Sequence, residues 1–185
     1  MKYYTIIGGV NGTGKSSLTG VLKAENKDLG TVIDVDKLNI EYGSKLEGGK
    51  IAVKRIKGCI NEGLSFTQET TLSGHKTAST AKTAKENGYF VRLYYVGLSS
   101  IDESLKRIAN RVQKGGHNIP PLDVIRRFDT RYSDIADVLP FCDEAVFYDN
   151  ENGFRAVAEY KDNKLNIFGS PVPTWVRELK EYLSK

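Results

Sequence analysis

The fold of this protein is decided close to its N-terminus, where residues 3–22 read YYTIIGGVNGTGKSSLTGVL. The stretch opens with a continuous run of β-branched and aromatic residues, which is typical of a strand buried on both faces of a parallel sheet. Gly8 ends this run, and the segment from Ser16 to Lys23 has the composition of a helix. Four glycines lie between the two. The stretch therefore predicts a strand, a glycine-rich turn and a helix in direct succession.

The glycine-rich turn matches the pattern GxxxxGKS from Gly9 to Ser16. Glycines let backbone N–H groups surround a phosphate and tolerate positive φ, while the following helix directs the positive end of its dipole at the same anion. We expect Lys15 to reach the β and γ phosphates of a nucleoside triphosphate and the Ser16 hydroxyl to ligate Mg2+. A glycine turn without a ligand is the alternative, and the strand–loop–helix setting weighs against it. The predicted nucleotide contacts are Gly9, Asn11, Gly12, Thr13, Gly14, Lys15, Ser16 and Ser17.

Length and composition favour one domain over residues 1–185, without disulfides or a membrane anchor. Cys59 and Cys142 lie beside apolar residues and are expected to be buried reduced thiols. No apolar run approaches the length of a membrane span, and the N-terminus lacks the zones of a signal peptide. We therefore expect a soluble cytoplasmic protein. The net charge of +4 is too small to imply a nucleic-acid partner by itself.

After the opening stretch, short strand patterns alternate with helical patterns up to about Asn150. This alternation implies a parallel sheet covered by helices on both faces. The later segment, about 153–184, predicts a β-hairpin added to that sheet and a closing helix. Before Asn150, the further expected strands cover 31–36, 64–72, 89–98 and 144–150. The helices expected between these strands cover 46–63, 76–88, 99–113 and 121–139.

A phosphate loop alone does not separate kinases from GTPases or large ATPases. The guanine-selecting NKxD and a strand ending in DxxG do not occur, and 185 residues leave little room for a large ATPase. A small phosphotransferase needs an acidic group that takes a proton from the acceptor hydroxyl, and arginines on a mobile segment that neutralise the transferred phosphoryl group.

Acidic candidates stand at the carboxyl ends of two predicted strands, the same edge as the phosphate loop. Asp34 and Asp36 end the second strand, and we expect them to point to opposite sides. One then faces the site and the other supports it; helix capping of the segment from Lys37 is the alternative role for either. Glu69 ends the third strand and precedes Thr70 and Thr71, with an exposed or capping acid as its alternative.

The arginines are spaced for joint use. Arg107 and Arg111 are four residues apart, as are Arg127 and Arg131, so each pair is expected on one helical face. The bend QKGGHNIPP lies between the two pairs, and we interpret residues 106–131 as a lid that closes over the site. The alternative is a charged helical face that only contacts solvent. His117 in the bend fits a hydrogen-bonding role better than that of a base or metal ligand, since no acidic or Cys partner stands at ligand spacing.

In combination, these motifs resemble the zeta-toxin-like P-loop kinases. The resemblance runs from about Tyr3 to Asn150, through GxxxxGKS, VIDVDKLN, FTQETTLSG, RIANRVQKGGHNIP, VIRRFDTRYSDI and FYDN. It implies an α/β, three-layer fold like that of nucleoside kinases, with five parallel strands in the order 2-3-1-4-5 flanked by helices. The hairpin and last helix lie outside it.

The resemblance also implies roles. Asp36 would be the general base, Glu69 with Thr70 part of an acceptor pocket, and Arg111 and Arg127 the stabilisers of the phosphoryl group, with Arg107 and Arg131 as alternatives. The complete acceptor-side set is Asp34, Glu69, Thr70, Thr71 and His117.

The activity implied is transfer of phosphate from ATP or GTP, with Mg2+, to the 3'-hydroxyl of the amino sugar of UDP-N-acetylglucosamine. An antitoxin partner is compatible with the family. The alternatives are a kinase of another acceptor, such as an antibiotic hydroxyl or a polynucleotide end, and a non-catalytic ATP-binding toxin-like module.

Overall fold

The computed structural model describes residues 1–185 with the exception of the side chain of Lys45. Its strands are β1 (Tyr3–Gly8), β2 (Thr31–Asp34), β3 (Phe66–Thr70), β4 (Phe90–Gly97), β5 (Glu144–Asp149), β6 (Arg155–Lys161) and β7 (Lys164–Ile167). Its helices are α1 (Lys15–Ala24), α2 (Val35–Glu41), α3 (Lys45–Glu62), α4 (Lys76–Glu86), α5 (Ile101–Gln113), α6 (Pro121–Asp129), α7 (Arg131–Val138) and α8 (Thr174–Leu183). A short 3-10 helix at Leu139–Phe141 follows α7. Of the residues that the structure describes, no helix has both the length and the apolar character needed to span a membrane.

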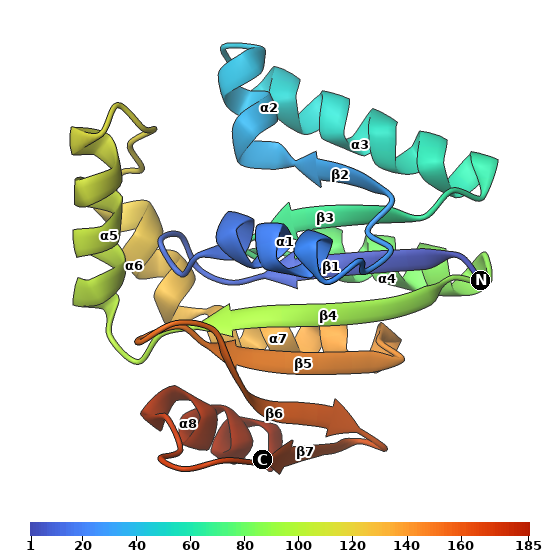
Figure 1. Ribbon diagram of the computed structural model, residues 1–185. Coiled ribbons are helices and arrows are strands. Elements are labelled where there is room, and N and C mark those ends of the chain that lie inside the picture. Colours follow the sequence, from blue (N-terminus) through green and yellow to red (C-terminus); the bar gives the residue numbers. More distant parts are fainter.

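The strands join side by side in the order β2-β3-β1-β4-β5-β6-β7 (Figure 1). The first five are parallel, which confirms the predicted order 2-3-1-4-5. The two strands of the predicted hairpin, β6 and β7, continue the sheet in antiparallel pairing beyond β5. The sheet is therefore mixed, and its parallel part carries the glycine loop at the end of its central strand.

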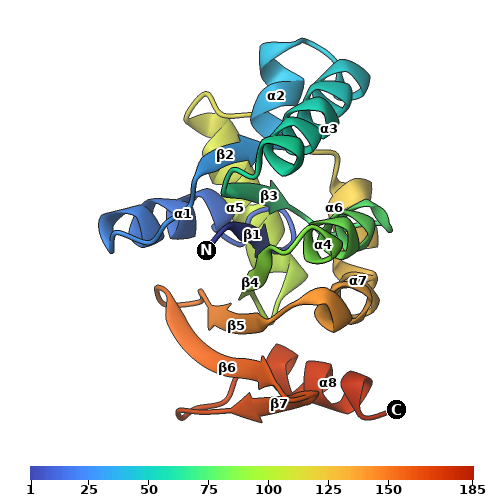
Figure 2. The ribbon, with the colours of Figure 1, turned by 90° about the vertical axis from the view of Figure 1, so that its right-hand side faces the viewer.

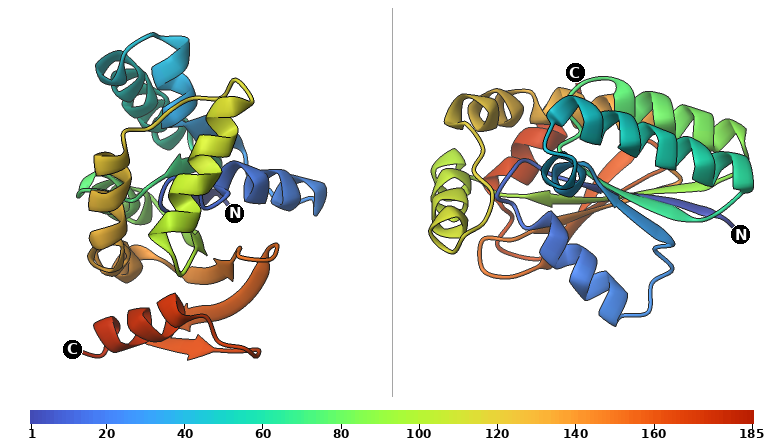
Figure 3. Two further views of the ribbon diagram at one scale, coloured as in Figure 1. Left: turned by 90° about the vertical axis from the view of Figure 1, so that its left-hand side faces the viewer. Right: turned by 90° about the horizontal axis from the view of Figure 1, so that it is seen from above.

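Helices cover both faces of the sheet (Figures 2 and 3). On one face α1 packs Leu18 and Leu22 against Ile7 and its neighbours in β4. On the other face α3, α4, α7 and α8 lie over a larger core that is centred on residues such as Phe66 and Phe147. Helices α5 and α6 stand at the edge where the parallel strands end, on the left of Figure 1. This is the three-layer arrangement that the alternating pattern predicted.

The predicted helix 121–139 is wrong in one respect, because it is broken into α6 and α7 at Thr130. The Thr130 hydroxyl donates to the Arg126 carbonyl at 3.3 Å, and the Ser133 hydroxyl donates to the Thr130 carbonyl at 2.8 Å. Short polar side chains that bond to nearby backbone in this way compete with continuous helix. The break turns α7 away from α6, so Arg127 and Arg131 do not share one helical face.

The second strand is also shorter than the predicted segment 31–36. It ends at Asp34, whose side chain caps α2 by accepting a hydrogen bond from the Lys37 N–H at 3.1 Å. Asp36 therefore lies in the first helical turn rather than on an extended strand. The prediction that Asp34 and Asp36 face opposite sides is wrong, because residues two apart on a strand lie on the same face, and in the structure both carboxylates line one cavity.

The C-terminal helix is anchored by Trp175, which is fully buried. Its indole Nε1 donates a hydrogen bond to Asp149 Oδ1 at 2.9 Å. The indole also lies directly on β4, where a Cβ added to Gly97 would come within 2.5 Å of the ring. Asp149 in turn precedes Asn150, whose backbone N–H bonds to the Gly97 carbonyl at 3.3 Å. The last helix thus supports the end of β5.

We expect Trp175→Phe to lower the free energy of unfolding by about 1–3 kcal/mol, because the buried Asp149 carboxylate loses the indole donor. Urea unfolding followed by circular dichroism measures this change. Tyr182→Phe, on the same helix and partly exposed, is the matched control and should leave the midpoint where it is. Equal midpoints for the Trp175 variant and the unmodified protein would contradict the proposed anchoring.

Candidate active site

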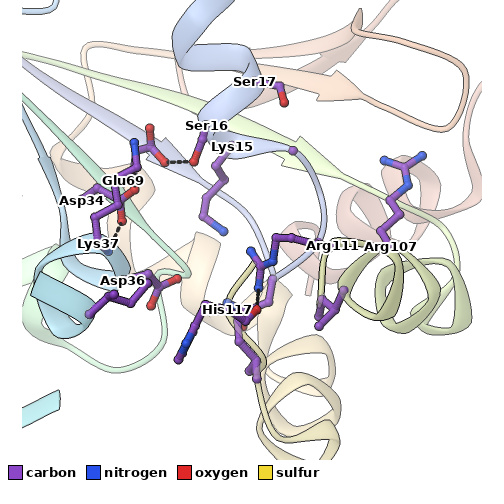
Figure 4. A pocket seen from close by; sticks show the side chains of 16 residues that line it. Lys15, Ser16, Ser17, Asp34, Asp36, Lys37, Glu69, Arg107, Arg111 and His117 are labelled. Carbon is purple, nitrogen blue, oxygen red and sulfur yellow. Dashed lines mark hydrogen bonds and ion pairs between the residues drawn. The ribbon is translucent and has the colours of Figure 1, made fainter. Parts of the chain in front are cut away.

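A cavity of about 400 Å³ opens at the carboxyl ends of the parallel strands, over the glycine loop (Figure 4). Three parts of the chain line it: the loop and start of α1, the acidic residues that follow β2 and β3, and α5 with the bend after it. Ligands of open parallel sheets bind at this edge. The residues that line it are Asn11, Gly12, Gly14, Lys15, Ser16, Ser17, Asp34, Asp36, Lys37, Ile40, Glu69, Arg107, Ile108, Arg111, His117 and Ile119.

The glycines of the loop are required by both conformation and space. Gly9, Gly12 and Gly14 all have φ values between 82° and 149°. A Cβ at Gly9 would lie 2.5 Å from the Val96 carbonyl oxygen, and one at Gly12 would lie 2.6 Å from the carbonyl oxygen of Ser104. Side chains at these positions are therefore excluded, and the backbone of the loop stays accessible from the cavity.

The side chains of two predicted nucleotide contacts, Thr13 and Ser17, do not point toward the acidic residues of the cavity. Thr13 is buried, and its hydroxyl donates to the Val10 carbonyl at 2.9 Å, so it stabilises the loop from within. Ser17 lines the cavity but points away from Asp36 and Glu69 in Figure 4.

Lys15 is folded back over the loop. Its Nζ donates hydrogen bonds to the carbonyls of Gly9 at 2.8 Å and Val10 at 3.2 Å. Burial lowers the pKa of the Lys15 ammonium, and the nearby carboxylates of Asp36 and Glu69 partly offset this effect. A phosphate in the cavity is the kind of anion that would compensate the buried charge.

Glu69 lies directly beneath the start of α1. Its buried carboxylate accepts hydrogen bonds from the Ser16 hydroxyl at 2.7 Å and the Thr19 hydroxyl at 2.6 Å. These contacts join the end of β3 to Ser16, the residue predicted to ligate the metal. Glu69 thus orients Ser16, in addition to the role in acceptor binding that was expected of it. Thr70 instead accepts a hydrogen bond from Leu72 N–H at 3.1 Å, and among the described residues neither Thr70 nor Thr71 lines the cavity.

Asp34 and Asp36 both line the cavity, contrary to the expectation of opposite sides. Burial raises the pKa of the Asp34 carboxyl, and the negative charges of Glu69 and Asp36 raise it further, while the hydrogen bond from Lys37 N–H lowers it. The Lys37 ammonium lies 3.8 Å from Asp34 Oδ2. Asp34 is thus occupied with capping α2, which leaves Asp36 as the carboxylate free to act on a ligand.

The donor set fits Mg2+. The Ser16 hydroxyl and the carboxylates of Asp34, Asp36 and Glu69 present hard oxygen ligands to one cavity. Within the described residues, no group of three or more His, Cys, Asp or Glu side chains forms a ready metal site. Mg2+ usually binds through one or two protein oxygens together with water and substrate phosphates, so the Ser16 hydroxyl with one carboxylate would be enough to hold it.

The lid arginines of α5 both line the cavity. Arg107 donates from Nε to Glu103 Oε1 at 2.8 Å and from Nη2 to the Asn150 carbonyl at 2.7 Å. Arg111 donates to the backbone carbonyl of His117 at 2.7 Å, which holds the bend against α5. His117 itself lines the cavity, so the structure places these three predicted residues together.

The two arginines of the second pair, Arg127 and Arg131, contact different parts of the molecule. Arg127 donates from Nη1 to Asn11 Oδ1 at 2.5 Å and so ties α6 to the glycine loop. Arg131 instead stacks on the rings of Phe128 and Tyr132, at 3.9 and 4.1 Å from their centroids, and donates to Glu178 of α8 at 3.2 Å. Arg131, predicted as an alternative site residue, therefore contacts α8 and is not among the residues that line the cavity.

Asn150 supports the glycine loop, a role that the sequence reasoning did not single out. Its side-chain Nδ2 donates to the Thr13 carbonyl at 2.7 Å, and it lies against Gly14, where an added Cβ would approach it to 2.5 Å. Its backbone carbonyl accepts from Arg107. Its position after β5, at the same edge as the loop, is the signal that could have identified it.

The chain is similar in sequence to a known bacterial protein. An uncharacterized protein of Haemophilus influenzae is 36% identical over 118 residues, which are 60% of this chain and 81% of that protein. No family model matches the chain.

Solved structures share the fold at low sequence identity. A chain from the PezAT chromosomal toxin–antitoxin system of Streptococcus pneumoniae superposes with a TM-score of 0.67 at 17% identity, covering 100% of this chain and 85% of that one. A chain of the AvrRxo1-ORF1:-ORF2 complex with ATP gives 0.73 at 17% identity, covering 100% of this chain and 64% of that one. A putative kinase from Chloroflexus aurantiacus gives 0.55 at 15% identity, covering 68% and 77%. The chain belongs to the same family as the Haemophilus influenzae protein, and it shares its fold with the chains from the PezAT system and the AvrRxo1-ORF1:-ORF2 complex.

Proposed function

We propose that this protein is a kinase that transfers the γ-phosphate of a nucleoside triphosphate to a hydroxyl group of a small molecule. The observation that carries the proposal is the shared position of Lys15, Asp36 and Arg111, which line one cavity at the glycine loop. They provide a phosphate ligand, a proton acceptor and a cation for the transferred group, the three functions that phosphoryl transfer needs.

The charges of the cavity suit a triphosphate. Four cationic side chains and three carboxylates line it, together with backbone N–H groups of the loop. A purely cationic cavity would bind anions in general, whereas this mixture favours an anion that arrives with a metal ion. The lining cations are Lys15, Lys37, Arg107 and Arg111, and the carboxylates are Asp34, Asp36 and Glu69.

These positions support the following reaction. The acceptor hydroxyl oxygen forms a bond to the γ-phosphorus, the bond from that phosphorus to the β,γ-bridging oxygen breaks, and the nucleoside diphosphate leaves. The hydroxyl proton passes to the Asp36 carboxylate, while Lys15 and the lid arginines hold the phosphate oxygens and exclude water. Mg2+, held beside the Ser16 hydroxyl, would neutralise charge on the phosphates.

Structural neighbours support the nucleotide and the reaction class. One of them was solved with ATP, and another is described as a putative kinase. The PezAT neighbour comes from a toxin–antitoxin system, and an antitoxin partner for this chain stays a prediction. For the acceptor, the resemblance to zeta-toxin-like kinases leads us to propose the 3'-hydroxyl of the amino sugar of UDP-N-acetylglucosamine.

The test is turnover with ATP or GTP and Mg2+, with and without UDP-N-acetylglucosamine, followed by mass spectrometry of the acceptor. We expect consumption of the triphosphate to depend on the acceptor and the acceptor to gain the mass of one phosphate. A phosphorylated product from a different nucleotide sugar would overturn the acceptor but not the reaction class. A protein that neither binds nor consumes ATP or GTP would overturn the kinase assignment.

A further inference from the structure

Arg131 joins three helices at the place where α6 ends and α7 begins. Figure 2 shows α7 between α6 and α8. The guanidinium lies over the rings of Phe128 in α6 and Tyr132 in α7. It also donates to the Phe128 carbonyl, to the Tyr132 hydroxyl at 2.9 Å and to Glu178 Oε2 of α8 at 3.2 Å. The Arg131 side chain is only 13% exposed, so a carboxylate from the C-terminal helix neutralises a largely buried cation at this junction.

The junction separates two hydrophobic cores. Ile135 of α7 and Trp175 of α8 belong to the main core of the sheet. Val124 of α6 is buried in a smaller cluster with Val10 of the glycine loop, and Phe128 packs against that cluster. Helices α7 and α8 are therefore fixed to the sheet, whereas α6 shares its core with the loop and the lid. The contact between Arg131 and Phe128 crosses from one core to the other.

Helix α6 touches the glycine loop at two neighbouring residues. Val124 shares its cluster with Val10, and Arg127 Nη1 donates to Asn11 Oδ1 at 2.5 Å. Both loop residues are buried, and the Val10 carbonyl also accepts a hydrogen bond from Lys15 Nζ at 3.2 Å. Because close-packed interiors transmit displacements, a shift of α6 would move the residues that hold the Lys15 ammonium in place.

We propose that Glu178 is a positioning residue for the phosphate loop, and that the C-terminal helix supports the lid through it. Glu178 Oε2 accepts from the Tyr132 hydroxyl at 2.7 Å as well as from Arg131, so it fixes the guanidinium against Phe128. Charge-assisted hydrogen bonds of this kind add geometric specificity. Phe128 then sets the position of α6, and α6 holds the loop. This inference rests on the proposed kinase function, and it gives a role to a helix that lies beyond the motifs.

The first test compares Glu178→Ala with Glu181→Ala, two exposed glutamates of the same helix. Alanine is a good helix former, so α8 should stay folded, and thermal unfolding checks this. In Glu178→Ala we expect hydrogen exchange of the α6 amides to become about three- to tenfold faster. The Kd for ATP with Mg2+ should rise by a similar factor, between the effect of an exposed ion pair and that of a buried charged hydrogen bond. Glu181→Ala should match the unmodified protein in both measurements.

A double-mutant cycle tests whether Glu178 acts through α6. Arg127→Ala removes the hydrogen bond from α6 to Asn11. In that background Glu178→Ala should change the Kd for ATP by less than about twofold, since the contact through which it acts is already lost. Fully additive effects would show that Glu178 does not act through this contact, and would overturn the proposed role.

The remaining outcomes separate this inference from the proposed function. If the folded Glu178→Ala protein keeps its α6 exchange rates and its affinity for ATP, Glu178 has no positioning role and the kinase assignment stands. If the unmodified protein binds neither ATP nor GTP, the proposed function falls, and the inference falls with it.

Discussion

Asp36→Asn is expected to lower the turnover of acceptor phosphorylation by about two to four orders of magnitude, the usual effect of losing a positioned base. The amide keeps the shape of the carboxylate but cannot take the hydroxyl proton. Asp36 lies in the first turn of α2 and lines the cavity over the glycine loop, where the proposed acceptor hydroxyl meets the γ-phosphate. Steady-state kinetics with saturating acceptor measures the effect.

ATP affinity should change little in this variant, because the proposed phosphate ligands belong to the loop and α1. Calorimetric titration with ATP checks this point. Asp162→Asn, in the turn between β6 and β7, is the matched control, and its turnover should equal that of the unmodified protein. Unchanged turnover in Asp36→Asn would remove Asp36 from the role of base.

Lys15→Ala is expected to weaken ATP binding and to lower kcat/KM by about two to three orders of magnitude, comparable to the loss of one preorganised charge-stabilising group. The Lys15 ammonium lies within the loop, where its Nζ bonds to the Gly9 and Val10 carbonyls. Its removal takes away the cation that the β and γ phosphates would meet. Titration with ATP and steady-state kinetics measure the two parts of the effect.

The control is Lys23→Ala, at the other end of the same helix. Thermal unfolding should be recorded for both variants, because Lys15 also makes hydrogen bonds within the loop. A folded Lys15 variant with normal ATP affinity and a normal rate would overturn the assignment of the loop as a phosphate site.

Much of the fold and part of the site could be predicted from local patterns. Strand composition, the GxxxxGKS spacing and the alternation of strands with helices act over short segments, so they identify the loop and place Lys15 and Ser16 at its end. The strand order 2-3-1-4-5 came from the resemblance of ordered motifs, and the pairing of the strands confirms it. Parallel topology then requires the residues after β2, β3 and β5 to lie at the edge where the loop lies.

The sequence by itself therefore determined the sheet, the loop, and which acidic residues and lid arginines were candidates. Only the tertiary structure decided which of them meet. Arg127 and Arg131 have the same spacing as Arg107 and Arg111, yet the helix breaks at Thr130 and Arg131 contacts Glu178. Glu69 joins Ser16, 53 residues away in the chain, and Asn150 joins Thr13, 137 residues away. Periodicity describes neighbours along the chain, whereas such contacts depend on how distant segments pack, and this is why spacing alone could not assign them.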